Sequence, residues 1–191
     1  MALKDYTWLN PPLDHSFDGE ALTVVTGKET DFWRETFYDF WRDSGHFLHG
    51  TVDGDFTAEV TIDGRYEVLY DQAGLMIRLS AANWIKAGIE YTDGEMYFST
   101  VVTNDTSDWS LIRVPVGEGG IRIRITRHHE AIRVQYLDAT DGHWKPARLA
   151  YFPPTPTVEV GIMCCSPQRE GFSVTFRDYR VGPPISRELH D

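Results

Sequence analysis

The sequence predicts an all-β fold in which two antiparallel sheets pack face to face as a β-sandwich. One observation is the recurrence of turn signals, at Asp18-Gly19, Asp53-Gly54, Asp63-Gly64, Asp93-Gly94, Asp141-Gly142 and the glycine-rich stretch 117–120. Asp-Gly suits tight hairpin turns because glycine adopts positive φ angles without strain. A second observation is that the segments between these turns are rich in Val, Ile, Thr, Tyr and Phe, which favour strands.

The third observation is the number of candidate strands, which is larger than one flat sheet accommodates. In chain order they are 21–26, 46–51, 55–62, 66–79, 83–91, 95–103, 110–114, 120–127, 131–137, 144–149, 157–165 and 171–181. Two facing sheets are therefore expected.

Alternation along the strands predicts which side chains face the core, because successive side chains of a strand point to opposite faces. Along 71–79 and 83–91 the expected core residues are Ala73, Leu75, Ile77, Leu79, Ile85, Ala87, Ile89 and Tyr91. Ile121, Ile123 and Ile125 are expected inward in the same way, with Arg122 and Arg124 outward. If the central strands are neighbours, one outward face carries Gln72, Arg78, Trp84, Lys86, Glu90, Ser99 and Thr103.

The segment 31–43, DFWRETFYDFWRD, has an unusual density of aromatic residues. Trp33, Phe37 and Trp41 recur at four-residue spacing, and Asp31 could cap a helix. Strand and loop covering an open end of the sandwich fit the same residues. We favour an irregular aromatic plug at such an end.

Composition and charge indicate a chain of one domain, residues 1–191, that can bury roughly 70% of its unfolded surface. The net charge of −11 disfavours nucleic acid and anionic membranes as partners. The absence of a signal-like or membrane-spanning apolar run predicts a soluble, cytoplasmic protein. We expect no cofactor. The adjacent Cys164 and Cys165 are expected to be reduced thiols on opposite faces of a strand.

Several runs together resemble one known family. They are TDFW (30–33), SGHFL (44–48), GDFTAEV (54–60), YDQAGLMIR (70–78), NWIKAGIEY (83–91), VVTNDTSDWS (101–110) and CSPQREGFSVTF (165–176). They resemble the regulation of enolase protein 1-like family (DUF1349), a domain of unknown function with a concanavalin A-like lectin/glucanase sandwich. The resemblance implies a two-sheet antiparallel jelly roll with a concave sheet face, an architecture that often binds or cleaves glycans. It implies no particular activity.

A carbohydrate site needs flat aromatic surfaces for the C–H side of a sugar ring and polar groups for its hydroxyls. Trp84 is expected to stack on such a ring, and Trp109 to close the site from a loop. Gln72, Lys86 and Glu90 would bind hydroxyls, while Arg78 and Arg133 would pair with an acidic substituent. The alternative is that both tryptophans are structural and packed under a loop.

Catalytic and metal sites have weaker signals. Glycoside hydrolysis uses two carboxyl groups about 5–9.5 Å apart, and the best available pair is Glu90 with Asp71. A Lys86–Glu90 ion pair would keep that carboxylate ionised, which is unsuitable for a general acid. The run His128-His129-Glu130 falls in a turn, and Asp53, Asp55 and Asp105 offer too few ligands for Ca²⁺. We therefore expect no catalytic residues and no metal.

The sequence thus predicts non-catalytic binding of a carbohydrate or polyol on the concave sheet face. One alternative is a protein-interaction module that associates with a metabolic enzyme, through an apolar patch around Trp33, Phe37, Phe40 and Trp41. Another is a glycoside hydrolase or lyase with non-standard acid residues.

Overall fold

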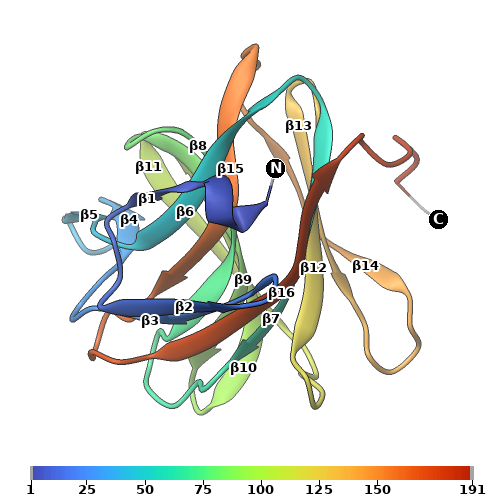
Figure 1. Cartoon of the computed structure of the whole chain (residues 1–191). Helices are drawn as coiled ribbons and strands as arrows, with labels where there is room; N and C mark the ends of the chain where they lie inside the picture. Colours follow the sequence, from blue (N-terminus) through green and yellow to red (C-terminus); the bar gives the residue numbers. More distant parts are fainter. Residues whose placement is uncertain (1, 190–191) are drawn as a thin grey trace.

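The computed structural model describes residues 2–189, and nearly all of its regular structure is β-strand. Two antiparallel seven-stranded sheets face each other (Figure 1). Sheet A has the order β1 (Thr7–Leu9), β6 (His46–Asp53), β15 (Thr157–Cys165), β8 (Gln72–Ser80), β9 (Asn83–Thr92), β10 (Glu95–Asn104), β11 (Thr106–Arg113). Sheet B has the order β14 (Trp144–Tyr151), β13 (Ala131–Leu137), β12 (Ile121–His128), β7 (Phe56–Gly64), β16 (Ser173–Gly182), β3 (Ala21–Val25), β2 (Asp14–Asp18).

The remaining elements are short. A 3₁₀ turn, η1 (Leu3–Asp5), precedes β1, and a two-stranded hairpin is formed by β4 (Phe32–Arg34) and β5 (Trp41–Asp43). The predicted antiparallel β-sandwich is confirmed. Within residues 2–189, no helix is long and apolar enough to cross a membrane.

Two strand predictions need correction. The strand predicted over 66–79 begins only at Gln72, because the Asp71 carboxylate accepts the backbone N–H groups of Glu67 and Val68, both at 3.0 Å, and holds a turn. Tyr70 adopts a positive φ of 67° there. The short strands β1, β2, β4 and β5 were not predicted, since three residues give too little alternation to detect and β2, DHSFD, is mostly polar.

The main core lies between the two sheets and consists of the residues that alternation placed inward. Leu75, Ile77, Ile85, Ile89 and Ile123 have no exposed surface. Leu79 packs against this core at its edge and is only partly buried. Cys164 belongs to this core, whereas Cys165 lies on the opposite face of β15, as alternation predicts. Both are free thiols whose pKa is raised by burial.

A second, smaller core lies on the outer face of sheet A. Its buried members are Phe32, Phe47, Met76, Trp84, Val101, Met163 and Cys165. Phe32 comes from the β4–β5 hairpin, which folds across the sheet. The aromatic segment 31–43 is therefore a hairpin covering a sheet face, and the expectation of an irregular plug at an open end of the sandwich is wrong. An outward sheet face with Trp84 and Met76 is apolar enough to need this cover.

His46, at the start of β6, is a buried histidine with both ring nitrogens occupied. Its Nε2 accepts the backbone N–H of Gly27 at 2.9 Å, and its Nδ1 donates to the carbonyl of Asn10 at 2.7 Å. This pairing fixes a neutral ring, because an imidazolium has no acceptor for Gly27. Burial lowers the pKa of His46 below its usual 6.5, although the hydrogen bond to Asn10 acts in the opposite direction.

This geometry predicts that acid destabilises the fold through His46. Because the folded-state pKa lies below the unfolded value, the unfolded chain binds more protons, so stability falls as pH drops below about 6.5. We expect the urea midpoint of unfolding to decrease when the pH is lowered from 7.5 to 5.5, and to decrease less in His46→Gln. The exposed His143→Gln is the control. An unchanged pH dependence in His46→Gln would contradict the assignment.

Candidate functional site

The outer face of sheet A holds a pocket beneath the β4–β5 hairpin, with a cavity volume of about 160 Å³. Its wall is largely aromatic and its floor is polar. The aromatic residues are Trp33, Tyr38, Phe40, Tyr70 and Trp109. The polar residues are Asp31, Gln72, Lys86, Glu90 and Gln168, and Val101 and Pro167 complete the lining.

Strand register builds the floor. Gln72 on β8 is paired with Glu90 on β9, and Lys86 and Glu90 share one face because they are four residues apart on the same strand. Gly88 lies between them, and a Cβ there would come within 2.0 Å of the Ala73 carbonyl oxygen. Glycine is therefore required at this position, and it leaves the floor between the lysine and the glutamate without a side chain.

Lys86 is the central charge of the floor and only 3% exposed. Its Nζ donates to Asp31 Oδ1 at 3.1 Å and to Gln72 Oε1 at 2.6 Å. Burial alone would lower the pKa of Lys86, but the charges of Asp31 and Glu90 and the hydrogen bond to Asp31 raise it above its usual value. Lys86 is therefore a fixed ammonium group, which excludes it as a neutral amine nucleophile.

The carboxylate that contacts Lys86 is Asp31 rather than Glu90, which corrects the expected Lys86–Glu90 ion pair. Asp31 also ties the hairpin to its base. Its Oδ1 accepts the Phe32 backbone N–H at 2.8 Å, and its carbonyl accepts the N–H groups of Ser44 and Gly45, both at 2.9 Å. The same residue thus fixes the hairpin and completes the pocket floor.

Glu90 is the second carboxyl group of the pocket. Burial raises its pKa, while the charge of Lys86 and hydrogen bonds from Ser99 and Trp109 oppose the rise. Trp109 extends over this end of the floor from β11, and its Nε1 donates to the Ser99 hydroxyl at 3.2 Å. The residue is 42% exposed and lines the pocket, so part of its indole is open to a ligand.

The hairpin provides the opposite aromatic wall. Tyr38 and Phe40 stack with ring centroids 5.3 Å apart, and Trp33 packs edge-on against Tyr38. The hydroxyls of Tyr38 and Tyr70 lie 3.4 Å apart, joining the hairpin loop to the sandwich. This hydrogen bond, with a smaller effect of burial, raises the pKa of Tyr70 to about 12.

The structure brings together four of the seven residues predicted for the site: Gln72, Lys86, Glu90 and Trp109. Trp84 does not line the pocket, and its expected stacking role is wrong. It has no exposed surface, it lies under Phe32 with ring centroids 6.0 Å apart, and its Nε1 donates to the Ala81 carbonyl. Phe32 packs against Trp84 in the second core, so a ligand ring cannot stack there.

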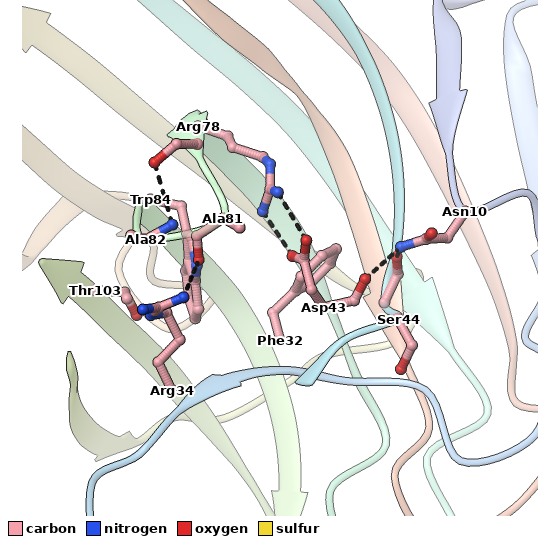
Figure 2. Close-up of polar contacts among 12 residues, drawn as sticks. Asn10, Phe32, Arg34, Asp43, Ser44, Arg78, Ala81, Ala82, Trp84 and Thr103 are labelled. Atoms are coloured by element: carbon pink, nitrogen blue, oxygen red, sulfur yellow. Dashed lines mark hydrogen bonds and ion pairs between the residues drawn. The ribbon is translucent and has the colours of Figure 1, made fainter. Parts of the chain in front are cut away.

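The two arginines predicted for the site, Arg78 and Arg133, also lie outside the pocket. Arg78 makes a two-pronged ion pair with Asp43 at 2.8 and 2.9 Å, and its side chain points toward the base of the hairpin (Figure 2). Arg133 lies on β13 of sheet B, on the other side of the sandwich. Neither is available to a ligand in the pocket, so the expected recognition of an acidic substituent has no support there.

Sequence reasoning missed the hairpin's contribution, namely Asp31, Trp33, Tyr38 and Phe40, together with Tyr70 and Gln168. Lys86 was a sequence signal that could have predicted the contribution of the hairpin. A cation expected on a sheet face beside a tryptophan needs an acidic partner, and DFWRETFYDFWRD is an aromatic segment that begins with one. Among residues 2–189, His, Cys, Asp and Glu form no group of three or more suited to a metal ion.

The fold defines the chain as a jelly-roll β-sandwich with one sheet face closed over by a hairpin. The chain belongs to the DUF1349 family, described as a protein of unknown function, whose model matches residues 8–184. The predicted family resemblance is therefore confirmed.

Relatives and solved structures agree with this assignment. The chain is 42% identical over 189 residues to "Regulation of enolase protein 1" of Saccharomyces cerevisiae, covering 99% of this chain and 95% of that protein. A crystal structure of a functionally unknown protein from Saccharomyces cerevisiae is similar with a TM-score of 0.92 and 41% identity, covering 97% of this chain and all of that one. The GH43 BlXynB protein from Bacillus licheniformis shares the fold alone, with a TM-score of 0.67 and 16% identity over 93% of this chain and 36% of that one.

Proposed function

We propose that the pocket on sheet A binds a single neutral carbohydrate or polyol ring and does so without catalysis. The observation that carries the proposal is an aromatic wall above a polar floor in a cavity of about 160 Å³. A cavity of about 150 Å³ holds a ring the size of benzene, so one sugar ring rather than a glycan chain matches the space. The fold shared with a GH43 protein is consistent with a glycan ligand and does not identify one.

The distribution of polar groups favours a neutral ligand. The open indole of Trp109 suits the C–H side of a ring, and Glu90, Tyr70 and Gln168 suit its hydroxyls. The ammonium of Lys86 is already paired with Asp31, so it offers little to an added anion. A pocket with two carboxyl groups and one ammonium group disfavours acidic sugars.

A stabilisation screen with neutral monosaccharides and polyols tests the proposal, because a ligand that binds only the native state raises its melting temperature. We expect at least one sugar to raise the Tm, and Trp109→Ala to weaken its binding by about tenfold through loss of the stacking surface. Trp41→Ala is the matched control, since Trp41 is a tryptophan of the β4–β5 hairpin that is 60% exposed and does not line the pocket.

Loss of binding in Trp41→Ala but not in Trp109→Ala would place the ligand elsewhere. Hydrolysis of a glycoside that stops in Glu90→Gln while binding persists would replace the non-catalytic proposal by the glycosidase or lyase alternative.

A second candidate function is protein interaction, favoured by one observation. Phe37 at the tip of the hairpin is 89% exposed, and Trp41 beside it is also exposed, which is unusual for aromatic side chains without a partner. The name of the yeast relative points in the same direction. No stabilisation by any sugar would favour this candidate, and Phe37→Ser would then be the variant to compare in partner capture.

A further inference from the structure

The outer face of sheet B, on the far side from the pocket, is rich in arginine. Strand register places Arg180, Glu59, Arg124 and Gln135 in one row across four adjacent strands. Arg133 follows in the next row, opposite Thr126 on β12. This cationic face belongs to a chain whose net charge is −11. Such a concentration of positive charge on an acidic protein needs its own explanation.

Arg133 is the least satisfied of these arginines. It is only 4% exposed, and its Nη1 donates to the carbonyl of Glu188. Its Nε and Nη2 are buried and have no hydrogen-bond partner in the part of the chain that the structure describes. These two nitrogens form one edge of the guanidinium, the geometry that two oxygens of one oxyanion match. Unpaired buried donors on a charged group are costly, and a bound ion is a recognised explanation.

Two other arginines of this face share one carboxylate among residues 2–189. Arg122 and Arg180 both donate to the same oxygen of Glu59, at 2.8 and 2.9 Å. The buried Nε of Arg122 also lacks a hydrogen-bond partner among the described residues. Glu59 is thus shared by Arg122 and Arg180, and no carboxylate among residues 2–189 forms an ion pair with Arg133. A guanidinium without a carboxylate partner suits a phosphate group, which carries about −1.5 to −2 charges and three acceptor oxygens.

A segment of chain and a cavity adjoin Arg133. The residues after β16 cross this face, where the backbone N–H of Ile185 donates to the Thr57 hydroxyl at 3.0 Å and Glu188 accepts from Arg133. Beside them is a cavity of about 520 Å³, lined by Gln135, Gly142, His143, Trp144, Lys145, Pro146 and Leu189. Gln135 lies two residues from Arg133 on the same strand face, and Leu189 follows Glu188. The cavity is therefore lined by neighbours of Arg133, and the segment that contains Glu188 lies between solvent and the guanidinium.

We propose that the outer face of sheet B binds a phosphate-type oxyanion on the Nε–Nη2 edge of Arg133, beneath the C-terminal segment 183–189. The recognition is by the paired N–H donors and the charge of Arg133 itself, and it is independent of the carbohydrate pocket on sheet A. The cavity beside Gln135 has room for the organic part of a phosphate ester, so the ligand class is a small phosphorylated molecule.

Titration with inorganic phosphate tests this site. Binding is measured by calorimetry and by the shift in melting temperature. The ionic strength is kept constant with chloride as the balancing anion. We expect phosphate to bind the native protein, and Arg133→Lys to weaken binding at least about tenfold, because lysine cannot present a two-pronged edge. The matched control is Arg113→Lys, whose side chain is exposed and paired with Glu95. It should bind phosphate as the unaltered protein does.

Three outcomes would overturn the proposal: no binding of phosphate beyond that of chloride, equal binding of acetate, or unchanged phosphate affinity in Arg133→Lys. If Arg133→Lys does not fold, Arg133→Gln provides the second variant, because it removes the charge and the two-pronged edge while keeping a polar side chain. A loss of phosphate affinity there supports the site, and an unchanged affinity opposes it.

Discussion

Replacing Lys86 by methionine is expected to destabilise the fold by about 3–5 kcal/mol. Methionine retains most of the side-chain volume, so the effect reports on charge. The substitution removes the ammonium that contacts Asp31 at 3.1 Å and Gln72 at 2.6 Å, leaving two carboxyl groups in a largely buried floor. Urea unfolding with a two-state fit would measure the loss.

Lys145→Met is the matched control, because Lys145 also makes a close ion pair, with Asp141, but at the surface. We expect its stability to remain near that of the unaltered protein, since exposed pairs contribute little. Equal stability losses in the two variants would contradict the central role of Lys86. The pKa of Glu90 should also rise further in Lys86→Met, because Lys86 is the main group that lowers it.

Replacing Phe32 by alanine is expected to cost about 3–5 kcal/mol, the usual range for a buried phenylalanine. Phe32 has no exposed surface and joins the hairpin to the second core through Trp84. Its loss also uncovers Trp84, so we expect a red shift of tryptophan fluorescence in the native state. Phe37→Ala on the same hairpin is the control, because its ring is 89% exposed.

The Phe37→Ala variant should change stability by no more than about 0.5 kcal/mol. A Phe32→Ala protein with unchanged fluorescence and near-normal stability would mean that the hairpin does not seal the sheet in solution. In that case the wall formed by Tyr38 and Phe40 would not be a fixed part of the pocket.

The two-sheet fold could be predicted because alternation along a strand is a local property. The same alternation placed Gln72, Lys86 and Glu90 on one face, and the register of β8 and β9 brings them together as expected. The extent of the domain, residues 1–191, stays a prediction. So does the assignment of the pocket residues to a ligand.

Three errors in the predicted site have a common cause. Alternation predicts which face of a strand a side chain is on, but it does not predict which other segment packs against that face. Trp84 was correctly placed on the outward face, yet the hairpin residue Phe32 covers it. Arg133 was also outward, but on the other sheet, and no local pattern states to which sheet a strand belongs. The partner of Lys86 is 55 residues away in sequence, a distance at which only the folded chain identifies Asp31.

The pocket is built from two separate parts of the chain, so one part can be exchanged for the corresponding segment of a relative. The hairpin segment 31–43 supplies Asp31, Trp33, Tyr38 and Phe40, while the sheet supplies the floor. Three anchors of the segment lie away from its pocket-lining aromatic residues, namely Phe32, the Asp43–Arg78 pair and the Asp31–Lys86 pair, and Arg34 adds hydrogen bonds to Ser107 and Asp105. A graft that retains these three anchors and replaces the aromatic positions between them would alter ligand preference while keeping the scaffold. The hairpin can thus be replaced as a unit. Libraries of variants restricted to its loop would sample new ligand specificities.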